Sequence, residues 1–567
     1  MLRLAPSLLL LFASADLARP RTDERPNIVL VMADDMGYTD IGCYGAEIAT
    51  PHLDRLAAGG LRYTQFYNTS RCCPTRAALL TGLYSHQAGI GLMTGDRGWD
   101  AYRGDLNRSC VTLAEVLREA GYRTYMSGKW HVTRHIGPNA DNSNWPLQRG
   151  FERFYGTIIG AGSFYDPATL CRSNTFITPE NDPEYRPATF YYTDAISDQA
   201  LRYVREHGEA EEEAPFFLYV AYTSAHWPMH APEEDIAAYD GVYDGGYPAI
   251  RAARLARGRE LGVLDPAWAL SEARADWESF EHPDWDIRCM QVYAAMVTVM
   301  DRGIGRLVAE LERQGELENT LFVYLQDNGG CAEGFGRGSN AHRAAEFDYE
   351  PFGPDELQDK IWPPMQTRDG RFVRTGPEVA PGAEDTFVGY GTGWANASNT
   401  PFRGFKHDAY EGGIATPFIV HWPAGVPAER AGGLVDEVGH LIDLMPTLCA
   451  VSGAQYPQER EGVAIQPMEG VDLSPSFGGA ALERSAPIGF EHHGNQALRD
   501  GRWKIVSQYR AGQERRWELY DMRADRSELH DLAQEQPERL ARMVDAWQAW
   551  ADRVGVRDWP FENKPRD

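Results

Sequence analysis

Short runs of apolar residues alternate with helical patterns along most of the first part of the chain. Two of the helical patterns are "VTLAEVLREAGY", where Gly121 provides a stop, and the longer stretch from Ile287 to Leu311. Runs that read as buried strands stand in "NIVLVMADD", "RTYMSGKWH", "PFFLYVAYTSAHW" and "TLFVYLQDNGG". The alternation predicts an α/β fold with a large mixed, mainly parallel sheet flanked by helices.

Each of these four runs leads into polar residues that are capable of chemistry. In open α/β sheets, ligands bind outside the carboxyl ends of the strands. Residues hundreds of positions apart in the sequence are therefore expected to meet at one edge of the sheet. The residues concerned are Asp34 and Asp35, Lys129 and His131, His226, and Asp327 and Asn328.

Two stretches interrupt the alternation, near residues 232–286 and 334–400, and both read as insertions. Such stretches near the active edge of a sheet serve as lids or binding loops, or only as surface decoration. From about residue 485 the pattern changes to two antiparallel strands, in "ALRDGRWKIVSQY" and "RRWELYDM", with a glycine-containing turn ahead of the first, and then a helix around 537–550. We expect a catalytic domain over 25–484 and a small C-terminal domain over 485–567.

The first fifteen residues have the pattern of a secretory signal, with one arginine, an apolar run and a small-residue cleavage site. The alternative is a short membrane anchor, but the run is shorter than the roughly 20 apolar residues that a span requires. We therefore predict an exported protein, periplasmic or secreted.

The net charge of the chain disfavours some classes of binding partner. A formal charge of −27 disfavours nucleic acid and anionic membranes, since both are polyanions. An anionic substrate would need a locally positive site. The chain has eight cysteines, which in an exported protein favour disulfides, although their pairing cannot be read from the sequence.

The acidic residues at the strand ends suggest a metal. Asp34 with Asp35, and Asp327 with Asn328, offer the oxygen ligands that Ca²⁺ and Mg²⁺ prefer. Either pair alone is more simply explained by helix capping or turn formation. The two pairs together predict a metal site. Beside it, Arg76, Lys129, Lys406, His131 and His226 would form a positive cluster able to hold an oxyanion ester.

The stretch "NTSRCCPTRAALLTG", from Asn68 to Gly82, carries two adjacent cysteines. Pro74 suits the first turn of a helix and Gly82 suits its end, which puts Cys72 at about the N-cap. The positive end of a helix dipole binds anions and lowers the pKa of a thiol. A disulfide is the competing explanation.

The same stretch carries a resemblance to a known family. "CCPTR" at 72–76, followed by "LLTG" at 79–82, matches the C-x-P-[ST]-R-x4-T-G signature of the type I sulfatases, members of the alkaline-phosphatase-like superfamily. The resemblance extends from Pro26 to about Pro446, and the C-terminal strands resemble the family's small domain. Its other motifs are Asp34-Asp35, "TPHLDRLAAGGLRYTQFY", "GKWH" at 128–131, "SAHW" around His226, "DNG" at 327–329 and Lys406 before "YEGG".

The resemblance implies a maturation step and a mechanism. A formylglycine-generating enzyme would convert Cys72 to Cα-formylglycine, whose hydrate attacks sulfur, whereas Cys73 stands at the variable position. One Ca²⁺, with Mg²⁺ less expected, would be held by Asp34, Asp35, Asp327 and Asn328 and would contact residue 72. Arg76 and Lys129 would hold the hydrate, His226 and Lys406 would bind sulfate and assist the departing alcohol, and His131 would help to re-form the aldehyde.

The predicted activity is hydrolysis of aryl or carbohydrate sulfate monoesters with release of sulfate. One alternative is a phosphonate or phosphate diester hydrolase, because the superfamily uses the same nucleophile and metal set on both esters. Another is a catalytically silent sulfoglycan-binding protein in which Cys72 is never converted. Candidates for the pocket rim are Trp227, His230, Trp394, His407, His492 and His493, although packing or surface exposure explains each of them more simply.

Overall fold

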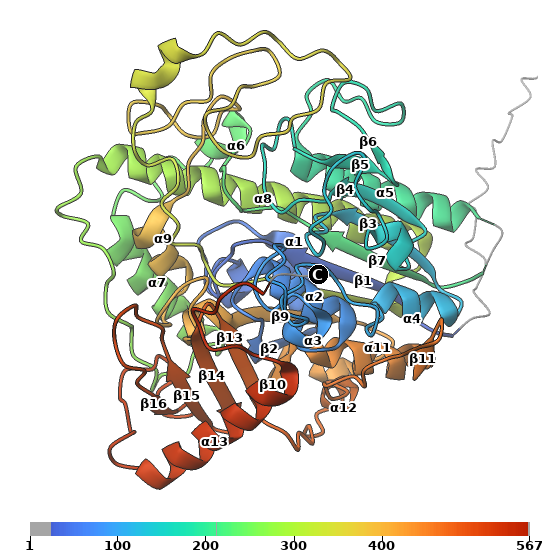
Figure 1. Ribbon diagram of the computed structural model, residues 1–567, viewed down its shortest axis with the longest axis vertical. Helices are drawn as coiled ribbons and strands as arrows, with labels where there is room; N and C mark the ends of the chain where they lie inside the picture. Colours follow the sequence, from blue (N-terminus) through green and yellow to red (C-terminus); the bar gives the residue numbers. More distant parts are fainter. Residues whose placement is uncertain (1–23, 211–212, 565–567) are drawn as a thin grey trace, which may run out of the picture.

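The computed structural model describes residues 24–210 and 213–564, so the predicted signal segment lies outside the described residues. A ten-stranded sheet forms the centre of the molecule (Figure 1). From one edge to the other, its strands are β10 (Gly433–His440), β2 (Leu61–Tyr67), β9 (Ala415–His421), β8 (Thr320–Gln326), β1 (Asn27–Ala33), β7 (Phe216–Ala221), β3 (Arg123–Gly128), β4 (Arg153–Thr157), β5 (Leu170–Arg172) and β6 (Thr175–Phe176).

The middle of the sheet is parallel, as the sequence predicts. β8, β1, β7, β3 and β4 run in one direction, and antiparallel pairing appears only where β9 joins β2 and β8 and where β5 joins β4 and β6. Every residue of β1, β7 and β8 is buried. Burial of each large aliphatic side chain contributes about 1.5–3 kcal/mol, which explains why these runs lack polar alternation.

Helices cover both faces of the sheet (Figure 1). On one face, α5 (Tyr192–Glu209) packs against α8 (Pro283–Gln314), which in turn contacts α1 (Pro51–Gly59). On the other face, α2 (Cys72–Thr81) contacts α3 (Ser85–Ala88), α4 (Leu113–Glu119) and α11 (Leu444–Ser452). The predicted helix at 287–311 lies inside α8, and Gly121 follows α4 closely, so both helical predictions are confirmed.

The C-terminal region holds a separate antiparallel sheet of four strands, two more than the sequence pattern indicated. These strands are β13 (Ile488–His492), β14 (Asn495–Asp500), β15 (Trp503–Ser507) and β16 (Glu518–Asp521), and α13 (Pro537–Val554) packs against them. The strands that were missed, β13 and β14, are short and joined by a two-residue turn, His493-Gly494. The sequence signal for such a hairpin is weak because neither strand alternates clearly.

Buried charges fasten this C-terminal sheet to the large one. Lys504 of β15 lies 2.8 Å from Glu411 of α10 (Glu411–Ile414) and 2.8 Å from Glu528. Arg526 bonds the second oxygen of Glu411 at 2.6 Å, and all four side chains are fully buried. Because each charge has an opposite partner, the cost of burial is offset.

The two irregular stretches have different surroundings. The first contains α6 (Glu233–Ala237) and α7 (Gly246–Glu260) and is tied to the core by Arg254, which pairs with Asp40 and Glu47. The second, which ends in α9 (Gly391–Ser398), has long loops at the top of the view in Figure 1. Two smaller features are α12 (Ser474–Phe477) and the hairpin of β11 (Glu459–Arg460) and β12 (Val463–Ala464).

Two further predictions concern cysteines and membranes. All eight cysteines lie in the described part of the chain, and each is a free thiol there, so the expected disulfides are not found. Seven of them are buried. Within the described ranges, no helix has both the length and the hydrophobicity needed to cross a bilayer.

Candidate active site

The polar ends of four strands meet, as the sequence predicts. β8, β1, β7 and β3 are consecutive and parallel in the sheet, so the residues that follow them lie along one edge. Arg76 from α2 and Lys406, from the loop before α10, complete the cluster. None of the ten predicted site residues is more than 8% exposed.

The first part of the cluster joins acids to Arg76 and Lys129. The Arg76 guanidinium donates to Asp327 Oδ2 at 2.9 Å and to the Lys129 backbone carbonyl at 3.1 Å, and it lies 3.6 Å from Asp34 Oδ2. The Lys129 ammonium bonds the same oxygen of Asp34. Two fixed cations therefore face one oxygen of Asp34.

The second part is centred on Asp35. Lys406 Nζ lies 2.7 and 2.8 Å from its two carboxylate oxygens, and the Asn328 amide donates to Oδ1 at 2.8 Å. His226 Nε2 is 3.4 Å from Asp35 Oδ2 and 3.5 Å from Lys406 Nζ. The other ring nitrogen of His226, Nδ1, donates a hydrogen bond to the Trp227 carbonyl at 2.6 Å, which leaves Nε2 facing Lys406.

Two oxygens in this cluster have no protein partner. Asp34 Oδ1 and Asn328 Oδ1 are both buried and both lack a hydrogen bond. Burial and the nearby Asp327 also raise the pKa of Asp34 well above its usual range, despite Lys129 and Arg76. Carboxylate and amide oxygens left unpaired inside a protein fit a hard divalent cation, which would satisfy the oxygens and favour the ionised form of Asp34.

Cys72 is the first residue of α2, and Arg71 is its N-cap, so the helix starts one position earlier than the sequence indicated. A hydrogen bond from Cys73 holds the pKa of the Cys72 thiol well below its usual range, and the charge of Lys129 acts in the same direction against the effect of burial. Cys72, Cys73 and His131 each offer an atom within 4.8 Å of the others. Residue 72 therefore lies at a positive helix end and faces the polar cluster.

His131 is the histidine nearest to this helix end. Burial lowers its pKa to about 4, so the ring is neutral near neutral pH. Its Nε2 lies 3.2 Å from Cys73 Sγ, and its Nδ1 has no partner. A neutral imidazole with an available nitrogen can accept a proton.

The backbone at this edge adopts unusual conformations. Asp35 and His131 have φ values of 57° and 56°, which non-glycine residues seldom adopt. Gly128, just before Lys129, has a φ of 115°, and a Cβ there would lie 2.0 Å from the Ala221 carbonyl oxygen. The chain thus turns sharply after both strands, and residues at strained positions of this kind cluster at functional sites.

Two charged residues of the cluster were not predicted from the sequence. The Glu333 carboxylate lies 3.4 Å from Lys406 Nζ, 3.1 Å from Arg71 Nη1 and 3.1 Å from His407 Nε2, and it accepts from the Trp227 indole at 2.9 Å. Burial acts to raise the pKa of Glu333, but His407, Lys406 and Arg71 together hold it far below its usual range. Only their closeness to the motifs in the sequence could have indicated these two residues, since Arg71 precedes Cys72 and Glu333 follows the "DNG" motif.

The suggested rim residues divide into two groups. Trp394 is fully buried, donates to the Asp286 carbonyl and packs against Tyr243 and Tyr247, so it belongs to the core. His230 is also buried and contacts the Thr386 carbonyl at 2.7 Å. The four others lie near the cluster. Trp227 contacts His226, and the rings of three histidines pack against one another: His407, His492 and His493.

Comparisons with known proteins agree with this geometry. The sulfatase family profile matches residues 26–454, and a profile described as N-sulphoglucosamine sulphohydrolase, C-terminal, matches residues 405–546. An uncharacterised sulfatase of Schizosaccharomyces pombe is 31% identical over 561 residues, covering 94% of each chain. An arylsulfatase of Klebsiella aerogenes is 32% identical over 469 residues, covering 81% of this chain and 93% of the relative.

Solved structures share the fold. A structure titled Ps i-CgsB in complex with k-i-k-neocarrahexaose aligns over 95% of both chains with a TM-score of 0.63 and 23% identity. A phosphonate monoester hydrolase of Agrobacterium radiobacter aligns over 94% of this chain and 96% of its own with a TM-score of 0.52 and 18% identity. The matching profile, the two relatives and the shared architecture together show that the chain belongs to the sulfatase family and is a sulfuric ester hydrolase.

Proposed function

We propose that the protein hydrolyses sulfate monoesters through a formylglycine nucleophile derived from Cys72. The observation that carries the proposal is the position of Cys72 at the start of α2, where the charges of Lys129 and Arg76 act on its side chain. In the proposed mature enzyme, the hydrated aldehyde oxygens take the place of the thiol sulfur. Maturation then requires a formylglycine-generating enzyme as a partner.

We propose that one Ca²⁺, rather than Mg²⁺, binds among Asp34, Asp35, Asp327 and Asn328 and contacts residue 72. The unpartnered oxygens of Asp34 and Asn328 support this assignment. When bound, the metal supplies Lewis-acid polarisation of a sulfate oxygen. Lys129 and Arg76 hold the nucleophile and neutralise the sulfate charge, and Asp327 accepts a proton as residue 72 attacks sulfur.

Lys406 and His226 serve the leaving group in this proposal. Burial lowers the pKa of His226 to about 3, so the imidazole is neutral and its Nε2 can accept from Lys406. The neighbouring Asp35 raises the pKa of Lys406 against the effect of burial, so the ammonium keeps its charge. Lys406 thus stabilises the alcohol oxygen as it departs, and His226 orients Lys406. His131 then removes the remaining hydroxyl proton so that sulfate leaves.

The preference for sulfate is tested with matched esters. We expect a much larger kcat/KM for 4-nitrophenyl sulfate than for bis(4-nitrophenyl) phosphate, because three cations and a metal surround a compact group with a single ester bond. Both reactions release the same phenol, so one absorbance assay compares them directly. A much greater efficiency on the phosphodiester would favour the rival diester hydrolase, to which the fold likeness with the phosphonate hydrolase gives some support.

Calcium removal should lower both stability and activity. A ligand that binds only the folded state stabilises it by about 4 kcal/mol at a thousandfold excess over Kd. We therefore expect a chelator to lower the Tm, and added Ca²⁺ to restore it better than Mg²⁺. Asp34→Asn is the matched variant, because it keeps the size of the side chain but removes one charged ligand. A Tm that responds equally to Ca²⁺ in both proteins would contradict the proposed site.

Localisation and domain structure complete the proposal. We infer that the protein is exported, periplasmic or secreted, from the leader-like residues 1–15, and that residues 25–484 and 485–567 form a catalytic and a small domain. The silent-binding alternative requires Cys72 to stay unmodified. A mass spectrum of the peptide containing residues 72 and 73, from protein made in its native host, decides between the two.

A further inference from the structure

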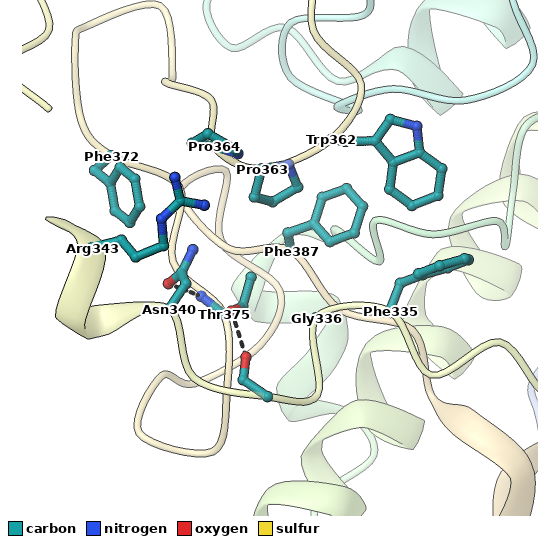
Figure 2. A pocket seen from close by; sticks show the side chains of 11 residues that line it. Phe335, Gly336, Asn340, Arg343, Trp362, Pro363, Pro364, Phe372, Thr375 and Phe387 are labelled. Carbon is teal, nitrogen blue, oxygen red and sulfur yellow. Dashed lines mark hydrogen bonds between the residues drawn. The ribbon is translucent and has the colours of Figure 1, made fainter. Parts of the chain in front are cut away.

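A cleft of about 270 Å³ lies in the irregular segment between β8 and α9 (Figure 2). Its volume is close to the lower end of the range for small-molecule sites, about 300 Å³. Figure 2 shows Phe335, Trp362 and Phe387 gathered on one side, and Arg343 and Phe372 on the other. Neither the family motifs nor the proposed mechanism uses these side chains.

Aromatic rings connect the cleft to the reaction centre. The Trp227 ring centroid lies 4.3 Å from that of His226 and 4.4 Å from that of Trp362. Phe335 contacts both tryptophans, with centroid distances of 5.0 and 4.6 Å. The buried Trp227 therefore joins His226 to the two rings that line the cleft, Trp362 and Phe335.

Two of these three rings are available to a ligand. Only four large hydrophobic side chains in the described part of the chain are exposed, and two of them are Trp362, at 40%, and Phe335, at 37%. Trp227 is only 6% exposed; its indole N–H donates to Glu333 at 2.9 Å, and its ring supports the two exposed ones. Exposed aromatic rings that touch one another beside a reaction centre are typical of a binding surface and not of the hydrophobic core.

The polar groups in the cleft are already engaged with the protein. The Asn340 amide donates to the Val373 carbonyl and accepts from the Thr375 N–H at 2.9 Å, and the Thr375 hydroxyl donates to the Gly338 carbonyl (Figure 2). Arg343 pairs with Glu346 at 3.2 Å. A saccharide would need free donors and acceptors here, whereas a flat apolar ring needs only the aromatic surface.

The charges around the cleft also favour an apolar leaving group. Each cation nearest to the rings has a carboxylate partner: Lys406 and Arg71 face Glu333, and Arg343 faces Glu346. The whole chain carries a net charge of −27. A leaving group with further sulfate or carboxylate groups would find no unpaired cation among these residues and would be repelled by the overall field.

We propose that Trp362 and Phe335, supported by the buried Trp227, form the leaving-group subsite, and that the preferred substrate is the sulfate ester of an apolar alcohol with two or more fused rings. This inference rests on the proposed sulfatase function and identifies its substrate class. The ring farther from the ester contacts Trp362 and Phe335, and Lys406 stays next to the ester oxygen.

The test compares phenyl sulfate with 2-naphthyl sulfate, whose leaving groups have similar acidity but different length. In the wild-type enzyme we expect a kcat/KM about tenfold higher for 2-naphthyl sulfate, mainly through KM, because the second ring buries further apolar area. Trp362→Ala should remove this advantage and leave phenyl sulfate within about twofold. Trp503→Ala is the control, since Trp503 lies on the C-terminal sheet and is only half-buried.

Binding without turnover separates this inference from the proposed function. 2-Naphthalenesulfonate should bind the wild-type protein about tenfold more tightly than Trp362→Ala does, and benzenesulfonate should not distinguish them. If sulfate esters are not cleaved but this difference persists, the proposed function is wrong and the aromatic subsite is supported. A naphthyl-to-phenyl ratio unchanged in Trp362→Ala, or a sulfated monosaccharide that is cleaved better than 2-naphthyl sulfate, would overturn the inference.

Discussion

Cys72→Ser should accept one sulfate group from an aryl sulfate and then stop. A serine hydroxyl at the start of α2 meets the same Arg76, Lys129 and Asp327 environment, so attack on sulfur remains feasible. The resulting sulfate ester lacks the second hydroxyl from which His131 would remove a proton. We therefore expect steady turnover to fall by about a thousandfold or more, with one equivalent of phenol released.

Intact-protein mass spectrometry measures the first half of this result, because the trapped protein gains the mass of one sulfate group. Absorbance of the released phenol measures the second half. Cys73→Ser is the matched control: its hydroxyl can keep the contact with His131 Nε2, which lies 3.2 Å from Cys73 Sγ, so activity should stay within about tenfold. Rapid steady turnover by Cys72→Ser, or loss of turnover in Cys73→Ser alone, would show that Cys72 is not the source of the nucleophile.

Lys504→Met should destabilise the protein by about 3–5 kcal/mol. Its ammonium lies 2.8 Å from both Glu411 and Glu528, and the three side chains are fully buried. Without it, Glu411 keeps its ion pair with Arg526, whereas Glu528 loses the ammonium group that pairs with it. Removing one partner of a buried charge pair costs far more than the pair contributes, because the remaining charge cannot be hydrated.

Urea unfolding followed by tryptophan fluorescence measures the change in free energy. Lys360→Met makes the same substitution at a side chain that is 58% exposed and pairs only with Asp359, so its effect should stay within about 0.5 kcal/mol. Equal effects of the two substitutions would show that the buried charges do not hold the C-terminal sheet in place.

The arrangement of the site was largely predictable because four buried strands are parallel. In such a sheet, Asp34, Lys129, His226 and Asp327 reach the same edge once their strands share a direction, and they meet because the four strands are neighbours. Lys406 and Arg76, which follow no strand of this set, were placed only through the family motifs. The mixed character of the sheet was also expected, and its antiparallel pairs are confined to β9 and β5.

Other features depend on contacts that no local pattern records. Glu333 gains its importance from Lys406, Arg71 and Trp227, which come from three distant parts of the chain. The missed hairpin of β13 and β14 is specified by packing against α13 rather than by its own alternation. Among the suggested rim residues, Trp394 and Trp227 looked alike in sequence and are both buried, and only their contacts separate the core residue from the one beside His226.

The proposed reacting groups and the aromatic cleft come from different kinds of structure. Asp34, Lys129, His226 and Asp327 are fixed by the central strands, whereas Phe335 and Trp362 belong to irregular chain between β8 and α9. Changes in that segment leave the hydrogen-bonded framework of the sheet untouched. Exchanging the segment between β8 and α9 for that of a relative is therefore the direct way to change which alcohol the enzyme prefers. The residues proposed to cleave the sulfate ester would stay in place.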